Sequence, residues 1–199
     1  TVPRSGNYTI KAYGADAEGM LGGRGAIITG TFTLTVGEII RILVGQRPYP
    51  YNTGNGGGGG GTFVVRAPYN TDSSILVIAG GGGGAQAHTN ASRLDLNIHG
   101  QAGSNGGSGT GSGSENWAPI YNIGGGSNGS VGLDGYTHNG GAGFYGSVGS
   151  GGGARAFTSP WDPSKPGIGG VVDSYQGGFG GGGRHGQNHG GGGGGYSGG

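Results

Sequence analysis

The chain contains no cysteine, so it can form neither disulfide bonds nor metal sites with thiolate ligands. It also lacks any stretch approaching the ~20 apolar residues of a membrane-spanning helix, which argues against direct insertion into a membrane. Ten basic and nine acidic residues give a net charge of +1, with no basic stripe and no block of like charge. This distribution predicts no nucleic-acid partner and no charged tail.

Proline is also scarce, with 8 residues against 60 glycines in a chain of 199. Collagen needs glycine at every third position and abundant proline, so the six consecutive glycines at residues 56–61 exclude it. Disorder is the other class that such a composition indicates. However, residues 56–61 lead directly into Thr-Phe-Val-Val-Arg, and Ile-Leu-Val-Ile-Ala leads directly into residues 80–84. This placement predicts folded glycine segments that are anchored to a hydrophobic core.

Ordered glycine runs need compensating interactions, because glycine loses more backbone freedom on folding than any other residue. Polyproline II helices are the natural candidate, since they make no internal hydrogen bonds and leave N–H and C=O groups free for neighbouring segments. Without Cβ atoms, such segments can approach closely and add weak Cα–H···O contacts. The glycine clusters are therefore predicted to form a bundle of polyglycine II helices.

Strand signals dominate the first part of the chain, and helix signals are almost missing. Apolar residues alternate with polar ones, mostly threonines, at residues 8–13 and 26–36, which is typical of strands with one solvated face. Apolar runs follow at residues 39–44, 62–66 and 75–79. Five strands joined by short connections predict an antiparallel, jelly-roll-like β-sandwich. The fold is thus expected to be mainly β, a sandwich fused to the glycine bundle.

We expect a single glycine-rich domain over residues 1–199. Residues 1–85 would supply most of the sandwich strands, and residues 86–199 would supply most glycine segments together with polar and aromatic inserts. The aromatic inserts can cap or pack the ends of the glycine segments, or they can form an exposed contact surface. The residues of this candidate contact surface are Trp117, Tyr121, Tyr136, Tyr145 and Trp161.

Catalytic motifs are not recognisable in the sequence. Neither Lys11 nor Lys165 has the setting of a phosphate-binding loop, and no nucleophile elbow occurs. His185 and His189 could bind a metal, but a surface loop is favoured because structural zinc needs four ligands. Gly-Arg-Gly at residues 23–25 is single, whereas RNA-binding segments of this class repeat Arg-Gly-Gly. The chain is therefore predicted not to be an enzyme and to need no cofactor or metal.

Three sequons for N-glycosylation begin at Asn7, Asn90 and Asn128. A chain this rich in Asn, Ser and Thr should contain roughly two by accident. Asn90 and Asn128 lie in predicted loops and are the favoured glycan acceptors, whereas Asn7 opens a predicted strand.

Several motifs, in order, resemble one family. Residues 8–15, Tyr-Thr-Ile-Lys-Ala-Tyr-Gly-Ala, resemble the opening strand of the glycine-rich domain in the anaplastic lymphoma kinase and leukocyte tyrosine kinase receptors. Residues 39–46, Ile-Ile-Arg-Ile-Leu-Val-Gly-Gln, resemble its strand that ends in a Val-Gly-Gln turn. Residues 56–65 and 76–83 are similar to its glycine segments at a strand entrance and a strand exit, and residues 177–196 resemble its last two glycine segments. Related domains occur in microbial surface proteins, and the resemblance implies the same sandwich and glycine bundle, outside the cell.

Some features depart from that family. The receptor domains carry a cysteine between their last two glycine segments, where this chain has Arg-His-Gly-Gln-Asn-His at residues 184–189. The 199 residues include no kinase sequence, and no motif carries cytokine-recognition residues over. Domains of this type also usually have a strand before the one predicted at residues 8–13. These departures disfavour a receptor role and favour the scaffold alone.

Two functions are therefore expected as alternatives. The favoured one is a non-catalytic extracellular structural protein, a subunit or repeat unit of a surface fibre, filament or matrix. Self-association by strand addition would assemble it, because a sandwich with an open edge can accept a strand. The alternative is a recognition module, a receptor ectodomain or an adhesin, that binds a ligand, glycans or a cell surface through loops between the glycine helices. Both place the protein in the secreted fraction or at the cell surface.

Overall fold

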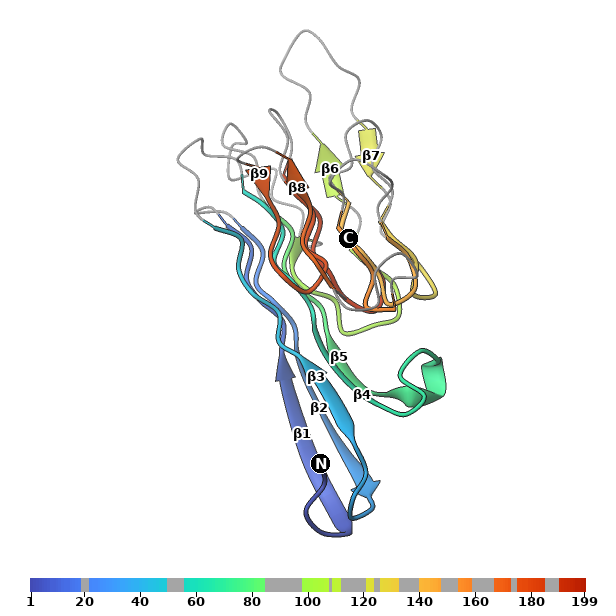
Figure 1. The fold of residues 1–199 in the computed structure, drawn as a ribbon. Coiled ribbons are helices and arrows are strands. Elements are labelled where there is room, and N and C mark those ends of the chain that lie inside the picture. Colours follow the sequence, from blue (N-terminus) through green and yellow to red (C-terminus); the bar gives the residue numbers. More distant parts are fainter. Residues whose placement is uncertain are drawn as a thin grey trace, which may run out of the picture.

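The computed structural model describes a chain built mainly of antiparallel β-structure (Figure 1). Among the described residues, the helical content is one short 3-10 turn, η1 (Asp72–Ser74). The fold class is thus confirmed as mainly β with almost no helix. The described residues are 1–18, 22–49, 56–84, 98–107, 109–111, 121–123, 126–132, 140–147, 154–158, 167–172, 175–184 and 190–199.

The first sheet is a hairpin of β1 (Gly6–Tyr13) and β2 (Ile27–Leu34), which pair antiparallel in one continuous register. Threonine fills the outer face of β2, and Thr9 on β1 lies directly opposite Thr31. The other face carries Ile10 and Ala12, whose cross-strand partners are Gly30 and Ile28. The hairpin therefore has the solvated face and the apolar face that its alternating sequence predicts. It forms the lower end of the molecule in Figure 1.

The second sheet has three strands in the order β3-β4-β5. They are β3 (Ile40–Leu43), β4 (Thr62–Arg66) and β5 (Ile75–Ala79), all antiparallel to their neighbours. The β4–β5 register shifts between Val64 and Val65, and η1 lies in the connection. The sequence placed all five strands within two residues of their observed ends.

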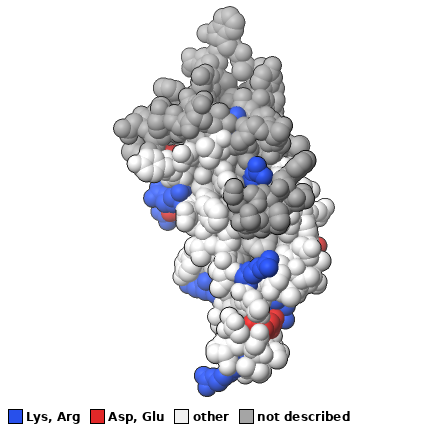
Figure 2. All heavy atoms as spheres, in the orientation of Figure 1, with Lys and Arg blue, Asp and Glu red and all other residues white. Residues whose placement is uncertain are grey.

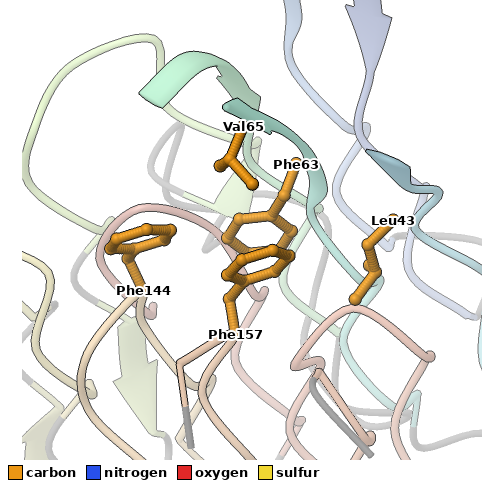
Figure 3. Packing of buried hydrophobic residues seen from close by; sticks show 5 residues of the cluster. All are labelled: Leu43, Phe63, Val65, Phe144 and Phe157. Atoms are coloured by element: carbon orange, nitrogen blue, oxygen red, sulfur yellow. The ribbon is translucent and has the colours of Figure 1, made fainter. Parts of the chain in front are cut away.

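Two hydrophobic clusters lie on opposite faces of the three-stranded sheet. One contains Ala12, Val64, Val77 and Ala79, with Ile10, Ile28 and Phe32 packed against them, so it joins the two sheets. The other, shown in Figure 3, contains Leu43, Phe63, Val65, Phe144 and Phe157. In it the rings of Phe63 and Phe157 stack with centroids 5.1 Å apart. This second cluster fixes the later part of the chain against β3 and β4.

Four short strands in the later part of the chain were not predicted. β6 (Gly109–Gly111) pairs with β7 (Tyr121–Ile123), and β8 (Val171–Val172) pairs with β9 (Tyr175–Gln176). With two or three residues each, they are too short to produce an alternating pattern in the sequence.

Glycine segments continue beyond the strand ends and lie side by side. The central tract (residues 56–61) enters β4 and is buried throughout. Gly58 and Gly61 donate backbone hydrogen bonds to Gly183 and Gly180, at 2.9 and 2.8 Å. Between them, Gly59 donates to Gly82 and Gly60 donates to Gln46. The bonding direction thus returns to the same neighbouring segment after three residues.

The exit tract (residues 80–84), which leaves β5, repeats this pattern. Gly81 and Gly84 both donate to the segment at residues 191–194, each at 2.7 Å, while Gly82 donates to Ala15 and Gly83 to Ile98. The central tract also accepts hydrogen bonds at the same interval, since the N–H groups of Gly191 and Gly194 donate to the carbonyl groups of Gly56 and Gly59. Backbone groups of neighbouring segments therefore satisfy one another without a sheet ladder.

Glycine is required at most of these positions by the close approach of other backbones. A Cβ atom on Gly60 would lie less than 3.0 Å from the carbonyl of Phe179, and one on Gly82 would lie less than 3.0 Å from that of Gly23. Real Cβ atoms essentially never come so close. Gly80 and Gly83 differ, because a Cβ atom there would have its nearest neighbours at 3.5 and 3.4 Å. These two positions of the exit tract, which we call outward, therefore have room for a side chain.

Candidate functional surface

The predicted aromatic contact surface falls mostly outside the described residues. Trp117, Tyr136 and Trp161 lie outside them, and Tyr121 is described only as a backbone position in β7. Tyr145 is the member whose side chain the structure describes, and it is 37% exposed. Grouping of the five aromatic residues therefore remains a prediction.

Tyr145 and Tyr196 both bind the carboxylate of Asp72. Their hydroxyl groups donate hydrogen bonds of 3.0 and 2.9 Å to the same oxygen, Oδ1. Tyr145 also packs edge-on against Phe144, with ring centroids 4.8 Å apart. The three residues come from the β4–β5 connection, the segment at residues 140–147 and the C-terminal segment. The cluster therefore ties three distant parts of the chain together.

The environment of this cluster keeps both phenols protonated. Partial burial, followed by the hydrogen bond to Asp72 and its negative charge, raises the pKa of Tyr145 to about 12. The same causes, in the same order, raise the pKa of Tyr196. Phenols that stay protonated keep donating to Asp72, so the arrangement is that of a structural tie. The sequence carried no signal for it, because Asp72 and Tyr196 are 124 residues apart.

Two of the three sequon asparagines lie on the described surface. Asn128 is exposed in a turn where Asn128 and Gly129 both have positive φ, 51° and 78°, and Ser130 N–H donates to Ser127 O at 2.9 Å. Asn7 is exposed on β1, where its Oδ1 accepts a 2.9 Å hydrogen bond from the hydroxyl of Thr33. Asn90 lies outside the described residues. The turn therefore places Asn128 at an exposed position.

The most distinctive described surface is the part of β3 that the hairpin leaves uncovered. Ile42 and Val64 are cross-strand partners and share one face of the three-stranded sheet, the face that packs on the hairpin. Val64 is 4% exposed, whereas Ile42 is 66% exposed and Val44 is 61% exposed. We call the surface of Ile42 and Val44 the open β3 face. The sequence predicts a mostly apolar strand at residues 39–44, and this pattern carries no signal that part of one face stays exposed.

The strand end of the molecule carries a small excess of positive charge. Residues 1–13, 27–44 and 62–79 contain four basic and two acidic residues. Glu38 pairs with Arg66 at 3.4 Å, and Asp72 is held by the two phenols. Lys11 and Arg41 lie over the rings of Tyr13 and Tyr69, at 5.1 and 3.8 Å from the ring centroids. On the face drawn in Figure 2, the Lys and Arg side chains form separate patches and not one continuous basic surface.

The described part of the chain offers neither a cluster of metal ligands nor a membrane-spanning helix. It contains no group of three or more His, Cys, Asp or Glu side chains that could hold a metal ion. His185 and His189, the candidate pair from the sequence, lie outside it. No helix among the described residues is long and apolar enough to span a bilayer.

Comparison with known proteins does not place the chain in a family. No protein-family model matches it, and no curated protein matches it. The resemblance to the receptor glycine-rich domains therefore stays a prediction based on the quoted motifs.

Proposed function

We propose that this chain is a non-catalytic extracellular structural protein, a subunit or repeat unit of a surface fibre, filament or matrix. The supporting observation is the lateral hydrogen bonding of its glycine segments at intervals of three residues. Polyproline II helices have three residues per turn and no internal hydrogen bonds, so their N–H groups point to three neighbours in succession. Gly58, Gly59 and Gly60 donate in this manner to three different segments. We therefore interpret the segments as a polyglycine II bundle, fused to a β-sandwich formed by the two sheets.

Such a body is suited to bearing load, because its interior consists of backbone groups that are already paired. The central tract is buried on all sides, and Cβ atoms would collide with carbonyl groups at most of its positions. A packed interior with so little free space transmits strain rather than absorbing it. The cluster of Leu43, Phe63, Val65, Phe144 and Phe157 joins the later part of the chain to β3 and β4, and the cluster around Val64 joins the two sheets.

Several described charged side chains already have structural partners, which supports the non-catalytic part of the proposal. Asp72 accepts two phenol hydrogen bonds, and Glu38 pairs with Arg66. Asp16 accepts a 2.9 Å hydrogen bond from the N–H of Gly25, between two adjacent glycine-rich segments. Each of these carboxylates joins segments of the fold. The alternative of a recognition module has no comparable support, since the hydroxyl of Tyr145 is itself engaged in the tie to Asp72.

Immunogold electron microscopy of the native source tests the function directly. An antibody raised against residues 1–199 should label filaments, a sheath or a matrix outside the cell, at regular intervals if the chain is a repeat unit. Labelling of dispersed soluble particles, or of the cell interior, would contradict the proposal. Pre-immune serum from the same animal is the control for non-specific labelling.

A further inference from the structure

We propose that the open β3 face, together with the free edge of β1, accepts one extended strand donated by another polypeptide chain. The donated strand carries apolar side chains at alternate positions and acidic side chains on its outer face. This inference rests on the proposed function and deepens it, because self-association by strand addition is the mode of assembly that the sequence predicts for such a subunit. It assigns that assembly to one site.

The backbone of β1 offers the hydrogen-bonding groups that such a strand needs. In the register of the hairpin, Gly14 N–H donates to Ala26 O, so even-numbered residues of β1 direct their backbone groups toward β2. Those of Asn7, Thr9 and Lys11 therefore point away from β2. Consistent with this direction, Tyr13 O accepts a 2.6 Å hydrogen bond from the hydroxyl of Thr62 instead of from β2. The described backbone–backbone bonds outside the sheets include none from Asn7, Thr9 or Lys11.

An apolar floor for the donated side chains lies beside this edge. The hairpin has two strands and the facing sheet has three. β1 contacts β4 and β5, and β2 contacts β5, so the hairpin lies mainly over these two strands. Ile40 on β3 still packs against the inter-sheet cluster, whereas Ile42 and Val44 are exposed. The paired residues Val64 and Ile42 differ sharply in exposure, and this difference marks the point where the hairpin stops covering the three-stranded sheet. A third strand beside β1 would lie over Ile42 and Val44 and would extend the inter-sheet cluster.

The width of the site decides between a donated strand and the rigid edge of a second copy. If β1 paired directly with β1 of a second copy, the two three-stranded sheets would meet first, because each has one strand more than its hairpin. The two paired β1 strands would be only about 4.8 Å apart. Each β3 extends beyond its own hairpin on that side, so the two β3 strands would collide. A single strand, about five residues long, fills the site without this collision.

Charge determines the outer face of the donated strand. Lys11 lies on the outer face of β1, and its neighbours on that face, Asn7 and Thr9, are uncharged. Opposite charges on adjacent strands of one face stabilise pairing, whereas like charges destabilise it. Arg4, near the start of β1, adds to the positive potential at this end of the molecule. Acidic side chains opposite Lys11 therefore favour the register that covers the open β3 face.

Peptide binding to the purified 199-residue protein tests the proposal. The probe is a labelled peptide with the core Val-Glu-Ile-Glu-Val, and the matched control peptide has the same residues in the order Val-Val-Ile-Glu-Glu. Fluorescence anisotropy should detect binding of the first peptide and weaker binding of the second. Replacing Glu by Lys in the probe should weaken binding at low salt more than at high salt, since exposed charges are screened.

Protein variants then place the peptide on the structure. Ile42→Ser should weaken binding by at least about tenfold, because it removes apolar surface that the peptide would bury. Ile27→Ser is the matched control, since Ile27 is 59% exposed on the opposite, outer face of the hairpin, and it should leave binding unchanged. Thr9→Pro should also weaken binding, because it removes an outward N–H without taking a donor from the β2 ladder.

The outcomes separate this site from the proposed function. Absence of peptide binding, equal binding to the Ile42→Ser variant, or equal binding of both peptides would overturn the acceptor site. A protein that instead dimerises through this face, with dimers lost in Ile42→Ser, would also overturn it in favour of copy-to-copy pairing. Extracellular filaments labelled in the native source would leave the proposed function standing in each of these cases. Peptide binding without such filaments would support the site and contradict the fibre.

Discussion

Gly82 and Gly83 are adjacent in the exit tract, yet a side chain would meet different surroundings at the two positions. A Cβ atom on Gly82 would overlap the carbonyl of Gly23, whereas one on Gly83 would have its nearest neighbour, Ile98 O, at 3.4 Å. Both residues donate lateral hydrogen bonds, so the difference lies in side-chain space alone. At the scale of the residue, glycine is thus required by position within the three-residue interval. The composition of the chain does not reveal that requirement.

Alanine substitution at the two positions should therefore have opposite effects on stability. Gly82→Ala should lower the free energy of unfolding by about 3 kcal/mol or more, because backbone must move against backbone. Gly83→Ala should change it by less than about 1 kcal/mol, and in the stabilising direction, since alanine reduces the freedom of the unfolded chain. Urea denaturation of the two variants and the parent protein measures both. Similar losses of unfolding free energy in both variants would contradict the assignment of Gly82 as an inward position and Gly83 as an outward one.

At the scale of the element, hydrophobic clusters and one polar tie connect segments that are far apart in the chain. Strands β4 and β5 follow from the sequence because their apolar runs are flanked by glycine and turn residues. Other features depend on which segments become neighbours. The exposure of Ile42 follows from a two-stranded sheet facing a three-stranded one, and the Asp72 tie joins residues 73 and 124 positions apart. No local pattern in the sequence encodes either of them.

The Asp72 tie should make stability fall at high pH. Because the pKa of Tyr145 in the folded protein, about 12, lies above its ordinary value of 10.0, the neutral phenol is the form that the fold favours. Its contribution is therefore fully present below about pH 10 and is lost as the pH rises through about 12. Urea midpoints measured from pH 9 upward should fall less steeply in Tyr145→Phe than in the parent protein. Tyr49→Phe, at a side chain that is 75% exposed, should keep the steep fall of the parent.

Asp72→Asn gives a second check on the same tie. It should lower the alkaline transition of Tyr145, followed by phenolate absorbance, but not restore it fully to the ordinary value. Partial burial, which is the largest cause of the raised pKa, stays in that variant. An unchanged transition would show that Asp72 contributes nothing to it.

At the scale of the whole molecule, backbone contributes an unusual share of the buried interior. The described apolar core consists of two compact clusters and one small alanine cluster, while the glycine segments bury mainly peptide groups. Exposure of apolar surface raises the heat capacity on unfolding, and exposure of polar surface lowers it. The balance should therefore differ from that of an ordinary globular domain.

Calorimetry should accordingly give a small heat-capacity change on unfolding. We expect a value per residue clearly below the usual ~12–15 cal/mol/K, and a correspondingly flat dependence of stability on temperature. Scanning calorimetry at several pH values below 10, where the tyrosine tie is intact, measures it from the slope of enthalpy against melting temperature. A value in the usual range would mean that apolar burial dominates after all.

The outward positions of the glycine segments have a consequence for how such a protein can diversify. Arg24 is exposed, whereas the glycines around it, at positions 22, 23 and 25, lie against neighbouring backbone atoms. Gly80 and Gly83 also lie at positions with room for a side chain. Substitutions at these positions can thus change the surface of the protein without changing the packing of the glycine segments inside it. Related proteins with this scaffold can therefore differ in surface charge, hydroxyl groups or attached sugars while the packing of the glycine segments stays the same.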